Sequence, residues 1–385
     1  MKISVAMATY NGQRFIREQL ESLGAQKRLP DELVVSDDRS TDRTLEVVEE
    51  FAHTAPFPVR IYRSERNLGF SDNFLRAAKL CKGDWIAFCD QDDIWLPNKL
   101  TVCEQYTDMP HNDVVLVAHN AEVVDESLAR SGVRYLNVRK KVICSGQRLP
   151  NLWVASGFTM MFRADLLSEF PCEERGPDPR VPTSRLAHDV WICRIARIVG
   201  DVVILPECLA LYRRHGLTTT TFLSGGNEAV RESRKFVRRV QALSTGGAGN
   251  YKMHARAARY QARIFDRFGR DLSLGRWRER FRKAAADYAG LSRWLLIRSQ
   301  LCGEARFYRR LQYLSALMLR NGYVRFNGYS MNNVRMMLRD AVFDFAVALY
   351  GPRGKGRAGD AAAGARESEN AGLDRLKVLR ERTRR

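Results

Sequence analysis

Short apolar runs and segments of helical periodicity alternate through residues 1–89, and this alternation limits the fold more than any other feature of the chain. Ile3–Ala8 is a short apolar run, and Gln13–Leu23 then places apolar residues at helical spacing. The cycle continues with Glu32–Ser36 and Thr41–Phe51, with Val59–Tyr62 and Phe70–Leu80, and with Asp84–Cys89. It predicts an α/β fold, a mostly parallel sheet flanked by helices, whose ligand crevice lies at the carboxyl ends of the strands.

The rest of the chain divides into regions of different character. Val114–Ala118 and Val154–Phe162 are expected to be strands and His188–Val199 a helix, so we predict one domain over residues 1–220. Residues 221–350 combine glycines with arginine-rich helical patterns, which predicts a basic helical region. Residues 351–385 hold few large apolar side chains, and we expect disorder there.

The basic charge is confined to the C-terminal region. The chain has a formal net charge of +19, yet residues 1–220 hold 28 basic and 30 acidic side chains. Residues 221–385 hold 35 and 14, so the excess would meet an anionic partner there, such as a membrane surface. An ordinary solvated face is the alternative. Nucleic acid is a weaker option because no nucleic-acid-binding motif accompanies the charge.

The cysteines and the N-terminus bear on the compartment. Eight cysteines are scattered without a CxxC pair, which favours reduced thiols in a cytoplasmic protein. We expect no signal peptide, because the N-terminus enters a strand-like run at once. We also expect no spanning helix, because no apolar run reaches ~20 residues. The predicted location is the cytoplasm, with peripheral contact to the inner face of the cell membrane if the basic region binds lipid.

The run Asp90-Gln91-Asp92-Asp93 follows the apolar run Trp85–Phe88 and is the sharpest chemical feature of the sequence. Carboxylates crowded at a strand end repel one another unless a cation or solvent relieves them. Hard oxygen ligands favour Mg²⁺ or Mn²⁺, which in turn hold phosphate oxygens. A metal diphosphate site is one interpretation of this run, and a solvated acidic turn is the other.

Three further groups of polar residues are expected near the same edge. Asp38 could accept a hydrogen bond from a pyrimidine imide or a ribose hydroxyl, whereas Ser40 and Asp42 offer capping oxygens to the helix that follows. Asp189 opens a helix and could take a proton from an attacking hydroxyl, or act as a helix cap. The run Tyr212-Arg213-Arg214-His215 offers cations for a diphosphate and an imidazole for a metal, or forms a solvated patch.

Taken together, five motifs over residues 1–220 resemble glycosyltransferase family 2, most of all bacterial rhamnosyltransferase-like members. The resemblance implies a GT-A fold and inverting transfer, in which one displacement at the anomeric carbon reverses its configuration. The motifs are Val5-Ala6-Met7-Ala8-Thr9-Tyr10-Asn11-Gly12, Ser36-Asp37-Asp38-Arg39-Ser40-Thr41-Asp42, Asn67-Leu68-Gly69, Asp90-Gln91-Asp92-Asp93-Ile94-Trp95 and His188-Asp189.

The resemblance also implies roles for individual residues. Asp189 matches the catalytic base. Asp92, with Asp90, matches the metal ligands, and His215 is a further candidate ligand. The donor nucleotide would contact Thr9, Tyr10, Asn11, Asp38, Asn67, Asp90 and Gln91, and the acceptor side would include Gly157, Phe158 and His188.

The predicted function is therefore metal-dependent transfer of a sugar from a nucleotide-diphosphate donor, with Mg²⁺ or Mn²⁺ as cofactor. The donor would be dTDP-rhamnose or a UDP-sugar, and the acceptor a hydroxyl of a glycan or lipid-linked molecule in bacterial surface polysaccharide biosynthesis. A sugar nucleotidyltransferase is an alternative, although Thr9-Tyr10-Asn11-Gly12 is not a glycine-rich basic loop. A non-catalytic nucleotide-binding protein that tethers a complex to the membrane is another. A dehydrogenase is disfavoured because no GxGxxG follows the first apolar run.

Overall fold

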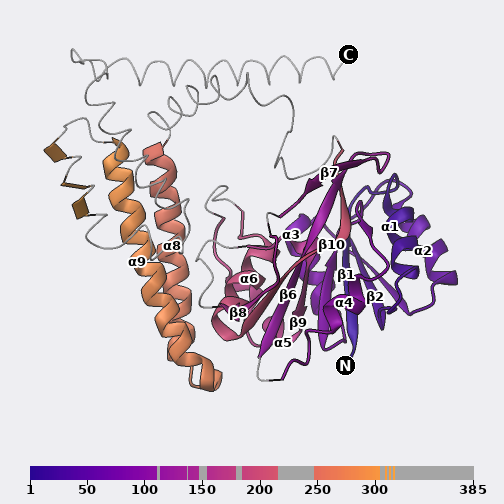
Figure 1. Cartoon of the computed structure of the whole chain (residues 1–385), viewed down its shortest axis with the longest axis horizontal. Helices are drawn as coiled ribbons and strands as arrows, with labels where there is room; N and C mark the ends of the chain where they lie inside the picture. The colour runs from indigo at the N-terminus through magenta and orange to yellow at the C-terminus, as the bar shows by residue number, and fades with distance from the viewer. Residues whose placement is uncertain are drawn as a thin grey trace, which may run out of the picture. The chain divides into compact units, whose positions relative to one another are not determined.

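A single mixed sheet forms the centre of the N-terminal region (Figure 1). The structure, a computed structural model, describes residues 1–110, 113–136, 138–146, 154–178, 184–215 and 247–303, with 308–309, 312–313 and 315–316. Within these residues the sheet has ten strands in the order β3-β2-β1-β4-β9-β6-β10-β5, with β7 beside β6 and β8 beside β10.

The first half of the sheet is parallel and follows the predicted alternation. β1 pairs in parallel with both β2 and β4, and β2 pairs in parallel with β3. The carboxyl ends of these strands therefore open at one edge, as expected. The elements are β1 (Ile3–Thr9), α1 (Ile16–Gly24), β2 (Glu32–Asp37), α2 (Thr44–Thr54), β3 (Val59–Arg63), α3 (Phe70–Lys79) and β4 (Trp85–Cys89).

The second half of the sheet is mixed, because β9 lies antiparallel between β4 and β6, while β6 and β10 run parallel. The predicted fold class, a largely parallel sheet flanked by helices, is confirmed, with these antiparallel strands added. The elements are β5 (Ile94–Trp95), α4 (Lys99–Glu104), β6 (Val114–Val124), β7 (Arg130–Arg134), β8 (Val142–Ser145), the 3₁₀ turn η2 (Gly157–Thr159), β9 (Met160–Arg163), α5 (Asp165–Ser168), η3 (Cys172–Glu174), α6 (His188–Val199) and β10 (Asp201–Arg213).

One predicted strand is wrong in its first part. Residues 154–162 were expected to be extended, but Gly157–Thr159 form a 3₁₀ turn and the strand begins at Met160. The backbone N–H and the hydroxyl of Thr159 both donate to the Ser156 carbonyl, at 2.9 and 2.8 Å, and so close the turn. The apolar pattern of the segment did not reveal these local bonds.

Alternate residues of the parallel strands face two layers of helices. Ile3, Val5 and Met7 belong to one buried cluster with residues of α1 and α2, which lie beside β1 and β2 in Figure 1. On the other face, the Arg76 guanidinium of α3 donates to the Ser36 hydroxyl at 2.8 Å. This two-layer burial is why the parallel strands are almost wholly apolar.

The start of α2 differs from the expectation for Ser40. Its hydroxyl donates to Asp37 at 2.5 Å and accepts from the Asn11 backbone at 2.9 Å, so it does not cap the helix. Asp42 does accept the backbone N–H of Thr44 at 3.0 Å, and α2 begins at Thr44. Ser40 does not cap the helix because its hydroxyl bonds to the loops at the sheet edge.

Two long helices follow, within the region predicted to be basic and helical. α8 (Gly247–Arg270) and α9 (Arg278–Gly303) lie side by side and are joined by η4 (Leu272–Trp277) (Figure 1). Phe170, ahead of η3, contacts Phe268 and Phe281 of this pair, with ring centroids 5.8 and 5.1 Å apart. The predicted end of the first domain at residue 220 and the predicted disorder of residues 351–385 lie outside the described residues.

Two further observations concern the described residues. Every cysteine whose side chain is described, seven in all, is free, in keeping with the predicted reduced thiols. Among the helices of the described part, none combines the length and apolar character needed to cross a membrane.

Candidate active site

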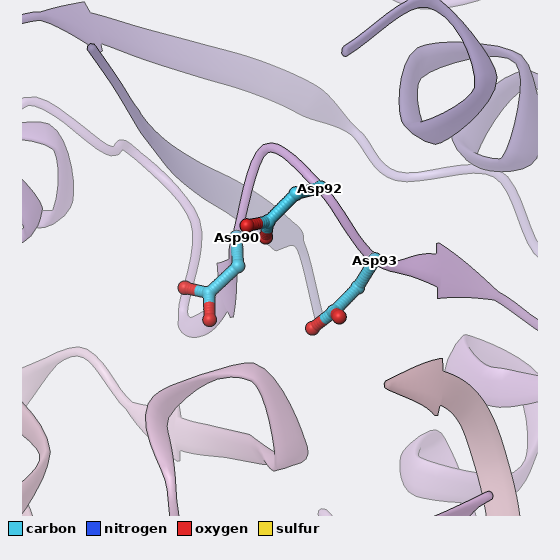
Figure 2. A group of neighbouring side chains, drawn as sticks. All are labelled: Asp90, Asp92 and Asp93. Carbon is cyan, nitrogen blue, oxygen red and sulfur yellow. The ribbon is translucent and has the colours of Figure 1, made fainter. Parts of the chain in front are cut away.

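Three carboxylates share one tight turn between β4 and β5. One oxygen from each of Asp90, Asp92 and Asp93 lies within 4.8 Å of the others. Figure 2 shows Asp90 and Asp93 on the two sides of this aspartate turn, with the Asp92 carboxylate directed toward Asp90. β4 is buried along its whole length, so the turn follows directly from the sheet interior.

Burial and mutual repulsion disfavour the ionised forms of this group. Burial, followed by the charges of Asp92 and Asp189, raises the pKa of Asp90 to about 8. Burial and the charges of Asp92 and Asp90 raise the pKa of Asp93 well above its usual range. Asp93 is fully buried, and its Oδ2 atom has no hydrogen-bond partner among the described residues. A cation at this turn would relieve both effects.

His215 meets the aspartate turn from the far end of the domain. Its Nε2 atom lies 2.8 Å from Asp92 Oδ2, although 123 positions separate the two residues. The imidazole also packs on the Phe15 ring, with centroids 4.6 Å apart. The segment after β10 therefore places an imidazole nitrogen beside Asp92, and its role as a metal ligand stays a prediction.

Arg213 is 2% exposed and its guanidinium bonds to protein groups, which disfavours the interpretation of the sequence in which it binds a diphosphate. Its guanidinium donates to the carbonyls of Asp92 and Glu126, both at 2.9 Å, and pairs with Glu18. Its backbone N–H donates to Asp93 at 3.0 Å. Arg213, the last residue of β10, thus holds the aspartate turn through both its side chain and its backbone.

The loop after β1 is bound to the aspartate turn by Gln91. The Gln91 side-chain amide accepts from the Tyr10 backbone N–H at 2.9 Å and donates to the Tyr10 carbonyl at 3.0 Å. Gly12 permits this approach, because a Cβ atom there would lie 2.2 Å from Gln91 Oε1. The Tyr10 ring is left half exposed at this edge, where a planar ligand could stack.

The other residues predicted to contact the donor nucleotide form hydrogen bonds within the same loops. Asn11 has a left-handed backbone, with φ of 46°, and its side chain accepts the Thr41 N–H at 2.8 Å. Thr9 donates to Asp37 at 2.9 Å. Asp38 accepts the backbone N–H groups of Leu68 and Gly69, at 2.6 and 2.8 Å.

Asp38 and Asn67 therefore belong to one arrangement. Asp38 is 2% exposed, and the Asn67 side chain donates to its carbonyl at 3.4 Å. The structure brings the loop at Asn67 to the ends of β1 and β2. Direct contact of these residues with a nucleotide stays a prediction.

His188 and Asp189 open α6 on the other side of the edge. The His188 ring is 5% exposed, stacks on Phe74 at 4.3 Å between centroids and meets Phe88 edge-on at 4.8 Å. Burial lowers the pKa of His188 to about 4. The ring lies directly behind Gly157, because a Cβ atom there would be 2.7 Å from His188 Nε2.

Asp189 remains partly exposed beside this aromatic group. Its Oδ1 atom accepts the N–H of Val190 at 2.7 Å, and Ala187 occupies the cap position of the helix. The charge of Asp189 contributes to the raised pKa of Asp90. The two carboxylates thus belong to the same electrostatic site.

Phe158 belongs to an aromatic wall that the sequence revealed only in part. Its ring stacks on Tyr212 at 5.1 Å between centroids and meets Tyr135 at 5.2 Å. The Tyr135 hydroxyl bonds to the Ser156 hydroxyl at 2.5 Å. Lys99, 1% exposed, donates from Nζ to the Phe158 carbonyl at 2.7 Å. Neither Tyr135 nor Lys99 stood out in the sequence, since each follows or precedes ordinary apolar residues.

The donor set at the aspartate turn fits a divalent cation. Carboxylate oxygens with a nearby imidazole nitrogen suit Mg²⁺ or Mn²⁺ better than a soft metal, and the cluster found among the described residues contains no cysteine. Asp93 Oδ2 supplies a buried acceptor that lacks a partner among the described residues. The structure adds Asp93 to the ligand set expected from Asp90, Asp92 and His215.

An α/β sheet with a carboxylate cluster at the carboxyl ends of its parallel strands is typical of enzymes that bind ligands at that edge, and comparison with known proteins narrows this class. Residues 4–170 match the family described as Glycosyl transferase family 2. The matched region runs from β1 through β9 and includes the aspartate turn.

Curated relatives are similar in sequence to parts of the chain. An uncharacterized protein of Mycobacterium tuberculosis is 27% identical over 217 residues, 55% of this chain and 59% of the relative. The dTDP-rhamnosyl transferase RfbG of Shigella flexneri is 44% identical over 98 residues, 24% of this chain and 34% of RfbG. The chain thus spans less than two thirds of the length of these relatives.

Among solved structures, Staphylococcus aureus TarS 1-349 in complex with UDP-GlcNAc is similar with a TM-score of 0.44 and 18% identity. That match covers 90% of this chain and 89% of the TarS chain.

Proposed function

We propose that the chain is an inverting, metal-dependent glycosyltransferase that moves a sugar from a nucleotide-diphosphate donor to an acceptor hydroxyl. The match of residues 4–170 to glycosyl transferase family 2 supports sugar transfer in general. The observation that carries the metal-dependent form is the aspartate turn, where one oxygen from each of Asp90, Asp92 and Asp93 lies within 4.8 Å of the others and His215 Nε2 lies 2.8 Å from Asp92.

The donor nucleotide would lie over the loops after β1 and β2. Tyr10 offers a half-exposed ring beside Gln91, and Asn11 and Asp38 hold the neighbouring loops in place. Thr9 and Asn67 flank the same place. Asp90, Asp92 and His215 would hold Mg²⁺ or Mn²⁺, which when bound offsets the charge that builds on the leaving diphosphate.

Asp189 would act as the base. In a single displacement, the acceptor oxygen forms a bond to the anomeric carbon while the bond from that carbon to the diphosphate oxygen breaks. The acceptor proton passes to the Asp189 carboxylate, which is partly exposed and anchored by Val190. Gly157 and Phe158, with His188 behind them, would form the wall on the acceptor side.

The first test is binding. Calorimetric titration with UDP, dTDP and GDP, with and without Mn²⁺, should give metal-dependent binding of one nucleotide class. Asp92→Asn should weaken that binding by at least about tenfold, since the substitution removes the charge of one carboxylate ligand. Glu49→Gln, on the exposed face of α2, serves as the matched control. A folded protein that binds no nucleotide would contradict the proposed donor site.

The second test concerns the base. Asp189→Asn keeps the shape of the side chain and should lower the rate of transfer by about 10²–10⁴-fold while sparing donor binding. Unchanged turnover would remove Asp189 from the mechanism. Release of pyrophosphate from a nucleoside triphosphate and a sugar phosphate would instead identify a nucleotidyltransferase.

The substrates can be proposed one step further. Similarity of a 98-residue stretch to a dTDP-rhamnosyl transferase supports dTDP-rhamnose as a donor, with UDP-sugars as the alternative. A glycan or lipid-linked acceptor in bacterial surface polysaccharide biosynthesis accords with this relative. Donor hydrolysis measured over a panel of sugar nucleotides would decide between the two bases.

A peripheral membrane location is part of the proposal, and the exposed face of α8 supports it. Residues 247–303 hold 13 basic and four acidic side chains. The exposed cations recur at helical spacing along α8, at Lys252, Arg256, Arg259, Arg263, Arg267 and Arg270. Basic faces of this kind bind anionic lipid with about 1 kcal/mol per cation.

Co-sedimentation of the full chain with phosphatidylcholine vesicles, with and without phosphatidylglycerol, tests this location. Replacement of Lys252, Arg256, Arg259 and Arg263 by Gln should reduce binding to anionic vesicles. The control removes four exposed cations elsewhere, at Arg17, Arg43, Arg66 and Arg130. Equal loss in both variants would mean a general charge effect and no docking face on α8.

A further inference from the structure

A buried lysine lies between the aspartate turn and the Gly157–Thr159 turn. Lys99 is the first residue of α4, and only 1% of it is exposed. Its ammonium lies 3.4 Å from the centroid of the Trp95 ring and donates to the Phe158 carbonyl at 2.7 Å. Burial of an ammonium costs several kcal/mol unless partners compensate for the lost water. Because this cost is large, we looked for an interaction of the Lys99 ammonium that compensates for it.

The bond from Lys99 joins two segments that are 59 positions apart. The carbonyls of Ser156 and Gly157 accept backbone N–H groups within their own turn, from Thr159 and Met160. The carbonyl of Phe158 instead accepts the ammonium of Lys99. This bond ties the turn to the segment that immediately follows Asp93 and β5.

The opposite side of the same turn is held by side chains. Gly157 lies against the His188 ring, and the Ser156 hydroxyl bonds to Tyr135 at 2.5 Å. Lys99 supplies the remaining restraint, from the side of the aspartate turn. Burial lowers the pKa of Lys99 to about 8, so the group stays largely protonated at neutral pH and is a strong donor.

We propose that Lys99 is a positioning residue that fixes the Gly157–Thr159 turn relative to the aspartate turn and thereby sets how tightly the acceptor is held. The inference rests on the proposed function, in which this turn is the wall on the acceptor side. The alternative is a purely electrostatic role, in which the Lys99 cation offsets the charges of Asp90 and Asp93 and its hydrogen bond to Phe158 does not matter.

Two neutral substitutions separate these roles. Lys99→Met has nearly the same length and no donor. Lys99→Gln also lacks the charge but keeps an N–H group that can approach the Phe158 carbonyl. Both variants lose the cation equally, so any difference between them reports the hydrogen bond.

Hydrogen exchange of the full chain gives a readout that does not need activity. In Lys99→Met, the amides of residues 156–160 should exchange about tenfold faster than in the wild type, as expected from loss of one charge-assisted hydrogen bond. The amides of β2 should be unchanged, and Lys99→Gln should lie between. Equal exchange in Lys99→Met and wild type, or equal acceleration in both variants, would overturn the proposal.

Steady-state kinetics supply the functional half of the test. Lys99→Met should raise the KM for the acceptor by about tenfold and Lys99→Gln by about threefold, with the donor Kd within twofold of wild type. A parallel loss of donor affinity in both variants would establish the general electrostatic role and overturn positioning. If Lys99→Met does not fold, Lys99→Gln is compared with the wild type: a higher acceptor KM with an unchanged donor Kd supports positioning, and a loss of donor affinity overturns it. If the wild type transfers no sugar, the proposed function fails, while the exchange result still tests the role of Lys99.

Discussion

Replacement of Arg213 by Met is the sharpest test of how the candidate site is built. Arg213 is 2% exposed and bonds through its side chain to the carbonyls of Asp92 and Glu126, and to Glu18. Glu18 is half exposed, so we assign little energy to that ion pair. Met retains most of the apolar stem and removes all of these bonds.

The two carbonyl bonds set the size of the effect. A hydrogen bond to a charged group contributes about 1.5–3 kcal/mol, so their loss should destabilise the chain by roughly 3–6 kcal/mol. Because Met restores some apolar packing, we expect the lower end, about 3 kcal/mol, or a fall in Tm of about 6–12 °C for a domain of this size. Mn²⁺ affinity should fall as well, since the aspartate turn loses its support.

Differential scanning calorimetry and Mn²⁺ titration of the full chain would measure both effects. Arg17→Met, which removes an exposed arginine paired with Glu50, is the control and should shift Tm by less than about 2 °C. If Arg213→Met behaved like this control, the inference that Arg213 holds the aspartate turn would be refuted.

Two further predictions concern the loops around the site. Burial holds the pKa of His188 at about 4, below its ordinary value of 6.5, so the unfolded chain binds more protons there between these pH values and stability falls as pH decreases through that window. His188→Phe should therefore lose up to about 3 kcal/mol less than wild type between pH 7 and pH 4 in urea unfolding, and identical losses would contradict this. Gly12→Ala would place a Cβ atom 2.2 Å from Gln91 Oε1 and should weaken nucleotide binding about tenfold by calorimetry, whereas Gly24→Ala, with 3.7 Å to its nearest atom, should leave binding unchanged.

The sequence alone was sufficient for the parallel half of the fold. β1, β2, β3 and β4 are located within one residue of their predicted limits, and α6 has the predicted limits. These elements are set by local periodicity: buried parallel strands must be continuously apolar, and their helices need one apolar face. The polar residues at the strand ends could be identified from the sequence because the limits of the apolar runs show where each strand ends.

The second half of the sheet was decided by tertiary structure. The insertion of β9 antiparallel between β4 and β6 pairs segments far apart in the chain, and no local pattern specifies such a neighbour. The Gly157–Thr159 turn was predicted as part of a strand because it lies within an apolar run, and its Phe158 ring packs against Tyr135 and Tyr212 in the fold.

The candidate site divides in the same way. The sequence identified the residue types at Asp90, Asp92 and Asp189, because crowded carboxylates at strand and helix ends have few uses. Only the folded chain brought His215 to Asp92, buried Lys99 under Phe158 and turned Arg213 from a candidate phosphate ligand into the support of the aspartate turn. The physical reason is that the residue type alone sets the chemistry of a side chain. Its partner, its burial and its remaining hydrogen-bonding capacity depend on segments more than 50 positions away.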